Sequence, residues 1–393
     1  MTEADVRSRK LAWLADQPGA VRPGGRYDAI VDRALVYARP DQVPAVLPYL
    51  SDDRGGLVLA GARALTRVRM LREKGYDDPI LIDPASYEKR YATPEQPFIL
   101  PTGQLEPTPL NDLLDQQRLA GATLAPTPTG YIRAGDVESL RAAVRQVVEL
   151  GRDDHILVAP LDVSLVDRAF YTQTRAILAA ARCPVALVLG KQFDPLDQAP
   201  TRLIPNLRDL AASIPLMPIR TDFNALDLLA HGAIAGAIGT GGSVRHTVDP
   251  AERPKSFNGN KDQSPSVLFP ELASWWRGSK ISKLYGARPA QETRCFCPVC
   301  GGQRLTRFQR RSDQNESMAH AIVVWSGWAG DLLAAPTMLG RAQYWRTFCS
   351  GALRYHGMIP EQLGQMEPLK PQHSLKQWAT MPIWPVTVPA SVP

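Results

Sequence analysis

Between residues 29 and 242, short apolar runs alternate with amphipathic stretches, and this alternation constrains the fold more than any other feature of the sequence. Parallel strands need a crossover, usually a helix, to return the chain in the same direction, so repeated strand and helix segments predict parallel strands. Seven or eight candidate strands favour a (β/α)8 barrel, with an open doubly wound sheet as the alternative. The candidate strands are residues 56–60, 79–82, 122–125, 155–159, 184–189, 215–219 and 233–238.

The intervening segments carry helix signals. Apolar residues recur at helical spacing over residues 137–150, behind Asp136 as a candidate N-cap. A second, shorter helix is predicted over residues 225–231, with Asn224 as its cap and Gly232 after its end. Both helices lie between candidate strands, as a barrel of strand and helix units requires.

Polar residues follow several candidate strands, and in a parallel barrel these carboxyl ends hold the functional site. They are Asp83, Asp162, Lys191, Gln192, Arg220 and Asp222. The last candidate strand runs into a glycine-rich loop, where the backbone N–H groups of Gly241 and Gly242, assisted by Arg245, are expected to bind a phosphate. The alternative is that these glycines serve tight packing at the barrel end.

Three of the five cysteines, Cys295, Cys297 and Cys300, lie within six residues, which is the spacing of metal ligands and not of a disulfide framework. His320 is the predicted fourth ligand, with His356 as its substitute. A Cys3His set suits tetrahedral zinc, and because four protein ligands leave no open position, the zinc is expected to be structural. The alternative is three cysteines that bind no metal.

Three regions are predicted along the chain. Residues 1–290 form the barrel with an N-terminal extension, residues 291–358 form a helical zinc-binding subdomain, and residues 359–393 form a proline-containing tail that does not pack as a regular element. No signal-peptide core and no run of about 18 apolar residues is present, so a cytoplasmic protein without a membrane span is expected.

A nucleic acid is the expected partner on grounds of charge. There are 45 Lys and Arg residues against 39 Asp and Glu residues, which gives a formal net charge of +6. Five arginines lie beside the cysteines, and they suit phosphate contacts, although a solvated helix surface is the equally weighted alternative. These are Arg294, Arg304, Arg307, Arg310 and Arg311. Trp275 and Trp276, with the pair Trp325 and Trp328, offer stacking faces for a base, but core packing is the favoured role.

A parallel barrel followed by Cys-x-Cys-x-x-Cys and a downstream histidine resembles the tRNA-guanine transglycosylase family, including its relatives that place 7-deazaguanine bases in DNA. The segment from Ile80 to Tyr87 is similar to the family's strand that ends in a site aspartate, and residues 188–192 resemble the strand end that carries a base-binding glutamine. The resemblance covers roughly residues 56–328. It implies that Asp83 acts as acid/base or secondary nucleophile, and that Asp162 and Gln192 bind a purine or deazapurine base.

The sequence departs from the family where the nucleophilic aspartate is expected. The corresponding run is Gly236-Ala237-Ile238-Gly239, which contains no carboxylate. Exchange of a base at C1′ needs a nucleophile that traps the sugar and an acid/base that moves protons. Either Asp222, at the end of the preceding strand, replaces the nucleophile, or the chain is a divergent member without base-exchange activity.

The leading hypothesis is therefore an enzyme, a pentosyltransferase that exchanges guanine for a 7-deazaguanine base in DNA or tRNA. The first alternative is a non-catalytic barrel that binds nucleic acid or a catalytic partner subunit, so homo- or hetero-oligomers remain open. A barrel enzyme for a small phosphorylated substrate is the second alternative, and a weak dependence of binding on salt would distinguish it from nucleic-acid binding.

Overall fold

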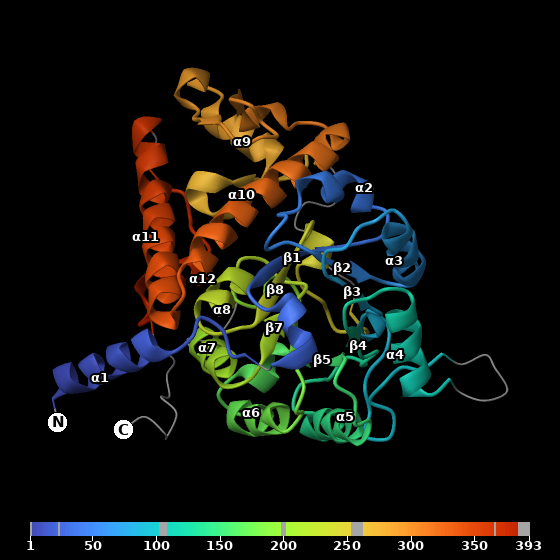
Figure 1. Cartoon of the computed structure of the whole chain (residues 1–393). Helices are drawn as coiled ribbons and strands as arrows, with labels where there is room; N and C mark the ends of the chain where they lie inside the picture. Colours follow the sequence, from blue (N-terminus) through green and yellow to red (C-terminus); the bar gives the residue numbers. More distant parts are fainter. Residues whose placement is uncertain are drawn as a thin grey trace.

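The computed structural model describes residues 2–22, 24–101, 108–197, 202–252, 262–364 and 367–383. Within these ranges the protein is an α/β protein with two four-stranded parallel sheets, ordered β3-β2-β1-β8 and β4-β5-β6-β7 (Figure 1). The strands are β1 (Arg33–Ala38), β2 (Leu57–Ala60), β3 (Ile80–Asp83), β4 (Ala125–Pro126), β5 (His155–Asp162), β6 (Val185–Gly190), β7 (Leu216–Pro218) and β8 (Ala235–Gly239). The prediction of parallel strands is thus confirmed.

Backbone bridges join the edges of the two sheets. Leu81 and Leu124 form a parallel bridge between β3 and the chain entering β4, and Thr221 and Ile238 form another between the end of β7 and β8. The strand order therefore runs from β1 to β8 and returns to β1, which makes the fold barrel-like.

Helices cover the outside of the strands and extend into a C-terminal lobe. They are α1 (Glu3–Asp16), α2 (Val43–Val46), α3 (Ala64–Glu73), α4 (Leu110–Leu119), α5 (Val137–Glu149), α6 (Tyr171–Ala179), α7 (Leu203–Ser213), α8 (Asn224–Ala230), α9 (Gly278–Tyr285), α10 (Gln314–Ala334), α11 (Met338–Gln362) and α12 (His373–Thr380). The predicted cap of α5 is confirmed, because the Asp136 carboxylate accepts a hydrogen bond from the Ser139 amide at 3.1 Å. Asn224 is not the cap of α8, because Asp222 accepts from the Asn224 amide instead.

Successive side chains along each strand belong alternately to two hydrophobic clusters, one on each face of the strand ring. One cluster fills the inside of the strand ring, and it includes Tyr37, Val58, Val158 and Ala237. The other lies between the strands and the surrounding helices, and it includes Val36, Leu59 and Leu157. Buried parallel strands carry apolar residues on both faces, which is why continuous apolar runs identified them in the sequence.

The strand β1 was not among the predicted ranges, although residues 34–38 form a continuous apolar run that could have indicated it.

The prediction for the tail was wrong in part. In the predicted tail, α12 packs on α11, with the rings of Trp345 and Trp378 centred 5.7 Å apart. Burial of Trp378 explains why this segment is regular. Residues 384–393, which hold the last three prolines, lie outside the described residues.

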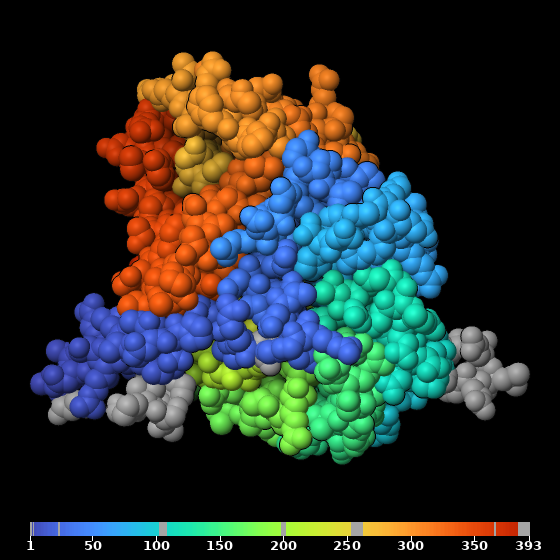
Figure 2. Space-filling view, in the orientation of Figure 1, coloured from blue at the N-terminus to red at the C-terminus, as the bar shows by residue number. Residues whose placement is uncertain are grey.

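The C-terminal lobe comprises residues 264–364 and stands over one end of the strand ring (Figures 1 and 2). It adds two antiparallel ribbons, β9 (Ser266–Phe269) with β10 (Ser274–Arg277) and β11 (Arg294–Cys295) with β12 (Gln303–Arg304). Val267, Ile281, Cys300 and Ile359 pack in one hydrophobic cluster of the lobe. Among the described residues, the helices are too short or too polar to cross a bilayer.

Candidate functional site

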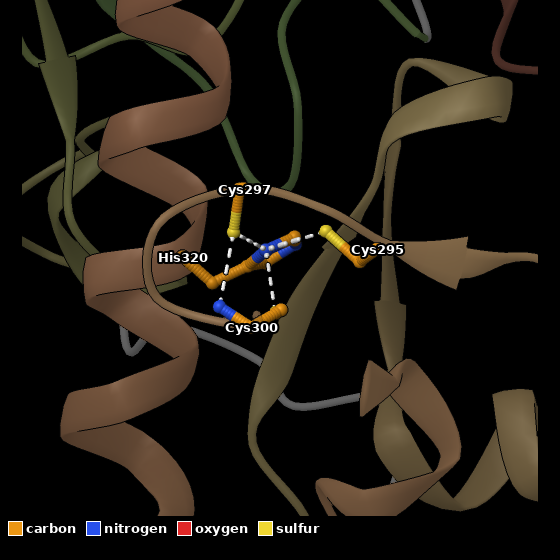
Figure 3. Close-up of side chains that lie close together, drawn as sticks. All are labelled: Cys295, Cys297, Cys300 and His320. Atoms are coloured by element: carbon orange, nitrogen blue, oxygen red, sulfur yellow. Dashed lines mark hydrogen bonds between the residues drawn. The ribbon is translucent and has the colours of Figure 1, made fainter. Parts of the chain in front are cut away.

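The four predicted metal ligands converge between the β11–β12 ribbon and α10 (Figure 3). Their ligand atoms all lie within 4.8 Å of one another, and the His320 Nδ1 atom lies 3.6, 3.4 and 3.4 Å from the sulfurs of Cys295, Cys297 and Cys300. A turn brings the thiols together, since the Gly301 amide donates to the Cys297 carbonyl at 2.9 Å and Gly301 has a φ of 54°. The cluster can bind a metal ion such as zinc.

The second ring nitrogen of His320 supports this assignment. Its Nε2 atom lies 2.8 Å from the Leu268 carbonyl oxygen, so Nε2 carries the proton and donates, which leaves the Nδ1 lone pair free to face the sulfurs. His356, the alternative ligand, instead lies against the Leu272 carbonyl at 3.2 Å and is not part of the cluster. The geometry therefore favours His320 as the fourth ligand.

The pKa values of His320 and Cys297 indicate that the cluster favours a positive charge beside the thiolates. Burial by itself would lower the pKa of His320, but hydrogen bonds with Cys297 and Cys300 raise it to about 9. Hydrogen bonds from Cys295 and Cys300 hold the pKa of Cys297 far below its ordinary value. A divalent ion would supply the same compensation to the thiolates and would be held by Nδ1 in place of a proton.

Asp83 is fully buried and its hydrogen bonds come from neighbouring protein groups. The hydroxyl groups of Tyr37 and Tyr87 donate to Oδ2 at 2.7 and 2.6 Å, and the Ala85 amide donates to Oδ1 at 2.8 Å. Burial and the nearby Asp83 charge raise the pKa of both tyrosines, so they stay protonated donors. In this arrangement the Asp83 carboxylate joins side chains inside the strand ring, and its acid/base role stays a prediction.

Asp162 and Gln192 also have internal partners. The Asp162 carboxylate accepts hydrogen bonds from the amide and hydroxyl of Ser164 and, at 3.2 Å, from the Tyr131 hydroxyl. A side chain at Gly190 would lie 2.3 Å from the Tyr131 ring, so the glycine leaves room for that ring at the strand end. Gln192 donates to Glu252 at 3.0 Å. The ring of Tyr131 thus occupies the space beside the predicted base-binding residues.

Asp222 and Arg245 lie close to each other beneath the lobe. The Arg245 guanidinium lies 3.2 Å from the centre of the Trp275 ring, whose other face stacks on Phe223 at 5.6 Å. Arg245 also donates to the Gly239 carbonyl at 3.2 Å. Burial lowers the pKa of Arg245 to about 9 and raises that of Asp222. Since Arg245 is held against Trp275, it is not directed at the exposed glycine loop, where Gly241 and Gly242 have open space above them.

Sequence reasoning missed Asp194, which follows β6 and lines the space at this end of the strands. Its buried Oδ2 atom has no hydrogen-bond partner among the described residues. The same holds, within those ranges, for the buried Asn224 Oδ1 and Arg245 Nη2 atoms, and all three residues line one small void of about 10 Å³. Burial, followed by repulsion from Asp222, raises the pKa of Asp194 well above 3.8. A Gly-x-Gln-x-Asp spacing after a strand was the only sequence signal available.

A cleft of about 1260 Å³ separates the carboxyl ends of the strands from the C-terminal lobe. Five cationic residues line it, which are Arg39, Arg220, Arg277, Lys280 and Lys370, against the three acidic residues Glu88, Asp194 and Glu252. Glu88 forms ion pairs with both Arg39 and Arg220. The φ angles of Phe193 and Arg220, 65° and 52°, are uncommon for residues with side chains, and such backbone is frequent at functional sites.

Comparisons with known proteins identify no family. No family model and no curated protein matches the chain. Among solved structures it is similar to the carboxyl transferase domain of Rhizobium etli pyruvate carboxylase with 3-bromopyruvate, with 13% identity, a TM-score of 0.35, and coverage of 96% of this chain and 70% of that one. It is also similar to a Rhizobium etli pyruvate carboxylase variant with acetyl coenzyme A, with 12% identity and a TM-score of 0.34. That match covers 97% of this chain and 40% of the other, and likeness at these scores says nothing about function.

Proposed function

We propose that the protein is a nucleic-acid-binding barrel of the guanine transglycosylase type, in which a (β/α)8 barrel and a structural zinc subdomain hold a polynucleotide between them. The basic cleft carries this proposal. Phosphates suit a groove in which five guanidinium and ammonium groups outnumber three carboxylates, and counterion release gives such binding its affinity. DNA and tRNA are both candidate ligands, and a cytoplasmic location with either is expected.

The carboxylates favour binding over base exchange. Asp83 and Asp162 are occupied by tyrosine hydroxyls, and Ala237, where the family carries its nucleophile, is a fully buried member of the interior cluster. The protein therefore fits a binding subunit, acting alone or beside a catalytic partner, better than an enzyme that uses these aspartates.

Binding can be tested by charge reversal on the cleft walls. The side chains of Lys280, on α9, and Lys370, in the segment before α12, both line the cleft and are exposed. In Lys280→Glu/Lys370→Glu, the affinity for labelled tRNA and duplex DNA should fall, and the slope of log affinity against log salt should become shallower by about 0.9 for each phosphate that the variant no longer neutralises. The matched control is Arg145→Glu, an exposed position on α5 away from the lobe (Figure 1). No binding to any polynucleotide at low salt would reject the proposal.

A second candidate is the base-exchange enzyme, and the unpartnered oxygen of Asp194 beside the cleft favours it. If the ionised Asp194 carboxylate traps C1′ of the sugar, the N-glycosidic bond breaks and the leaving guanine takes a proton from water; the incoming base then displaces the carboxylate and releases its proton to water. Labelled guanine should enter tRNA or DNA with wild-type protein and not with Asp194→Asn. Absence of incorporation by wild-type protein would leave binding as the function.

A further inference from the structure

Phe296 lies between two candidate metal ligands and projects into solvent. Its exposed fraction is 80%, whereas the other exposed large apolar side chains lie between 37% and 42%, apart from Leu119 at 83%. Cys295 and Cys297 both point to the metal cluster, so the backbone on either side of the ring is fixed (Figure 3). Gly302, with a φ of 85°, approaches the ring edge, because a Cβ there would lie 3.3 Å from it. The backbone that carries the ring is therefore anchored on both sides, and the ring itself is exposed.

Two arginines in the ribbon next to Phe296 have no acidic partner among the described residues. Arg294 and Arg304 lie directly opposite each other in the β11–β12 ribbon, and like charges in that register are destabilising. Neither forms an ion pair with any acidic group among the described residues, and the buried Arg304 Nε has no hydrogen-bond partner there. Arg294 donates one hydrogen bond, to the Gly302 carbonyl at 3.1 Å. An anion outside the chain would remove this repulsion.

We infer that the surface formed by Arg294, Phe296 and Arg304, here called the knuckle surface, binds an unpaired segment of a polynucleotide. A base stacks on the Phe296 ring, and the neighbouring phosphates contact the two guanidinium groups. In a duplex, neighbouring base pairs cover both faces of each base, so a projecting ring has nothing to stack on. This inference rests on the proposed nucleic-acid binding, and it specifies that part of the bound polynucleotide is single-stranded.

The knuckle surface can be tested with Phe296→Ala and Phe296→Tyr in the full-length, metal-loaded protein. The probes are a labelled oligothymidine and a labelled hairpin duplex of equal length. Loss of one stacked base should weaken oligothymidine binding by Phe296→Ala about five- to tenfold and leave duplex binding unchanged. Phe296→Tyr keeps the ring and should bind both probes as wild type does. Leu119→Ala, equally exposed but on α4, is the matched control.

The outcomes separate this inference from the proposed function. If the duplex binds in a salt-dependent way and Phe296→Ala binds oligothymidine as wild type does, the knuckle surface is rejected and the cleft proposal stands. An equal loss of affinity for both probes would also reject it, because a stacked unpaired base would then not account for the loss. Competition by poly-glutamate as strong as that by oligothymidine would reject it too, because the surface would then bind an acidic peptide as well as a polynucleotide. If no polynucleotide binds, both proposals fall. Metal content, measured on every variant, should stay at the wild-type level.

Discussion

The aspartates at the strand ends and the cysteines of the lobe were both expected to form sites, but they differ in how their polar atoms are satisfied. Asp83 accepts three hydrogen bonds from its own chain, two of them from tyrosines that the surrounding core holds in place. The thiols of Cys295, Cys297 and Cys300 face one another and one imidazole nitrogen. Both groups are held by short-range contacts, but only the second brings several ligand atoms within 4.8 Å of one another.

The difference shows how a buried polar group can be interpreted. Leaving such a group without a partner costs free energy, so a satisfied group stabilises the fold, whereas converging unsatisfied groups mark a place for a ligand. By this criterion we expect the metal cluster and Asp194 to be binding features, and Asp83 and Asp162 to be structural ones. Three experiments test this contrast.

The largest effect is expected from removal of the metal. The change Cys297→Ser, or treatment with a strong chelator, should release bound zinc and lower the melting temperature by on the order of 10 °C or more, because metal binding contributes directly to folding free energy. Metal content by plasma mass spectrometry and thermal melting measure both effects. The control is Cys349→Ala, which removes a buried thiol outside the cluster and should keep the metal. An unchanged melting temperature after complete metal loss would remove the structural role of zinc.

A smaller effect is expected at Asp83. The change Asp83→Ala removes the carboxylate acceptor of two buried tyrosine hydroxyls, which keep only their contact with each other at 3.1 Å. It should lower the free energy of unfolding by about 3 kcal/mol, as read from urea titrations. Asp83→Asn keeps one acceptor oxygen and should cost less. Asp16→Ala, on the exposed end of α1, serves as the surface control. Normal stability of Asp83→Ala together with abolished base exchange would show that Asp83 is catalytic and not an anchor.

The smallest effect is expected at Asp194, and it depends on pH. Burial and the Asp222 charge raise the pKa of Asp194 in the folded state, so the native protein binds more protons than the unfolded chain and loses stability as pH rises above about 4. Asp194→Asn should therefore melt about 2–4 °C higher than wild type near pH 7. This gain should disappear as the pH falls to about 4. A lower melting temperature at pH 7 would instead indicate an ionised Asp194 paired with Arg245.

Much of the fold could be predicted because its signals are local. The apolar runs of β5 and β6 and the capped, amphipathic α5 depend on neighbouring residues alone. The helix α12 was missed because its order comes from packing of Trp378 on a helix some 30 residues earlier, and nothing in a Pro-containing tail indicates that contact. Asp194 was missed for a similar reason, since its neighbours Asp222 and Arg245 come from two other strand ends.

The sequence by itself determined the alternation of strands and helices and the identity of the metal ligands, because both are encoded in short spacings along the chain. Only the tertiary structure decided which polar residues are available to a ligand. Tyr87 is four residues from Asp83, but Tyr37 is 46 residues from it and Tyr131 is 31 residues from Asp162, and folding of the strand ring brings these two donors to their aspartates. Whether a carboxylate is an anchor or a site depends on which donors surround it, and folding alone brings those donors near.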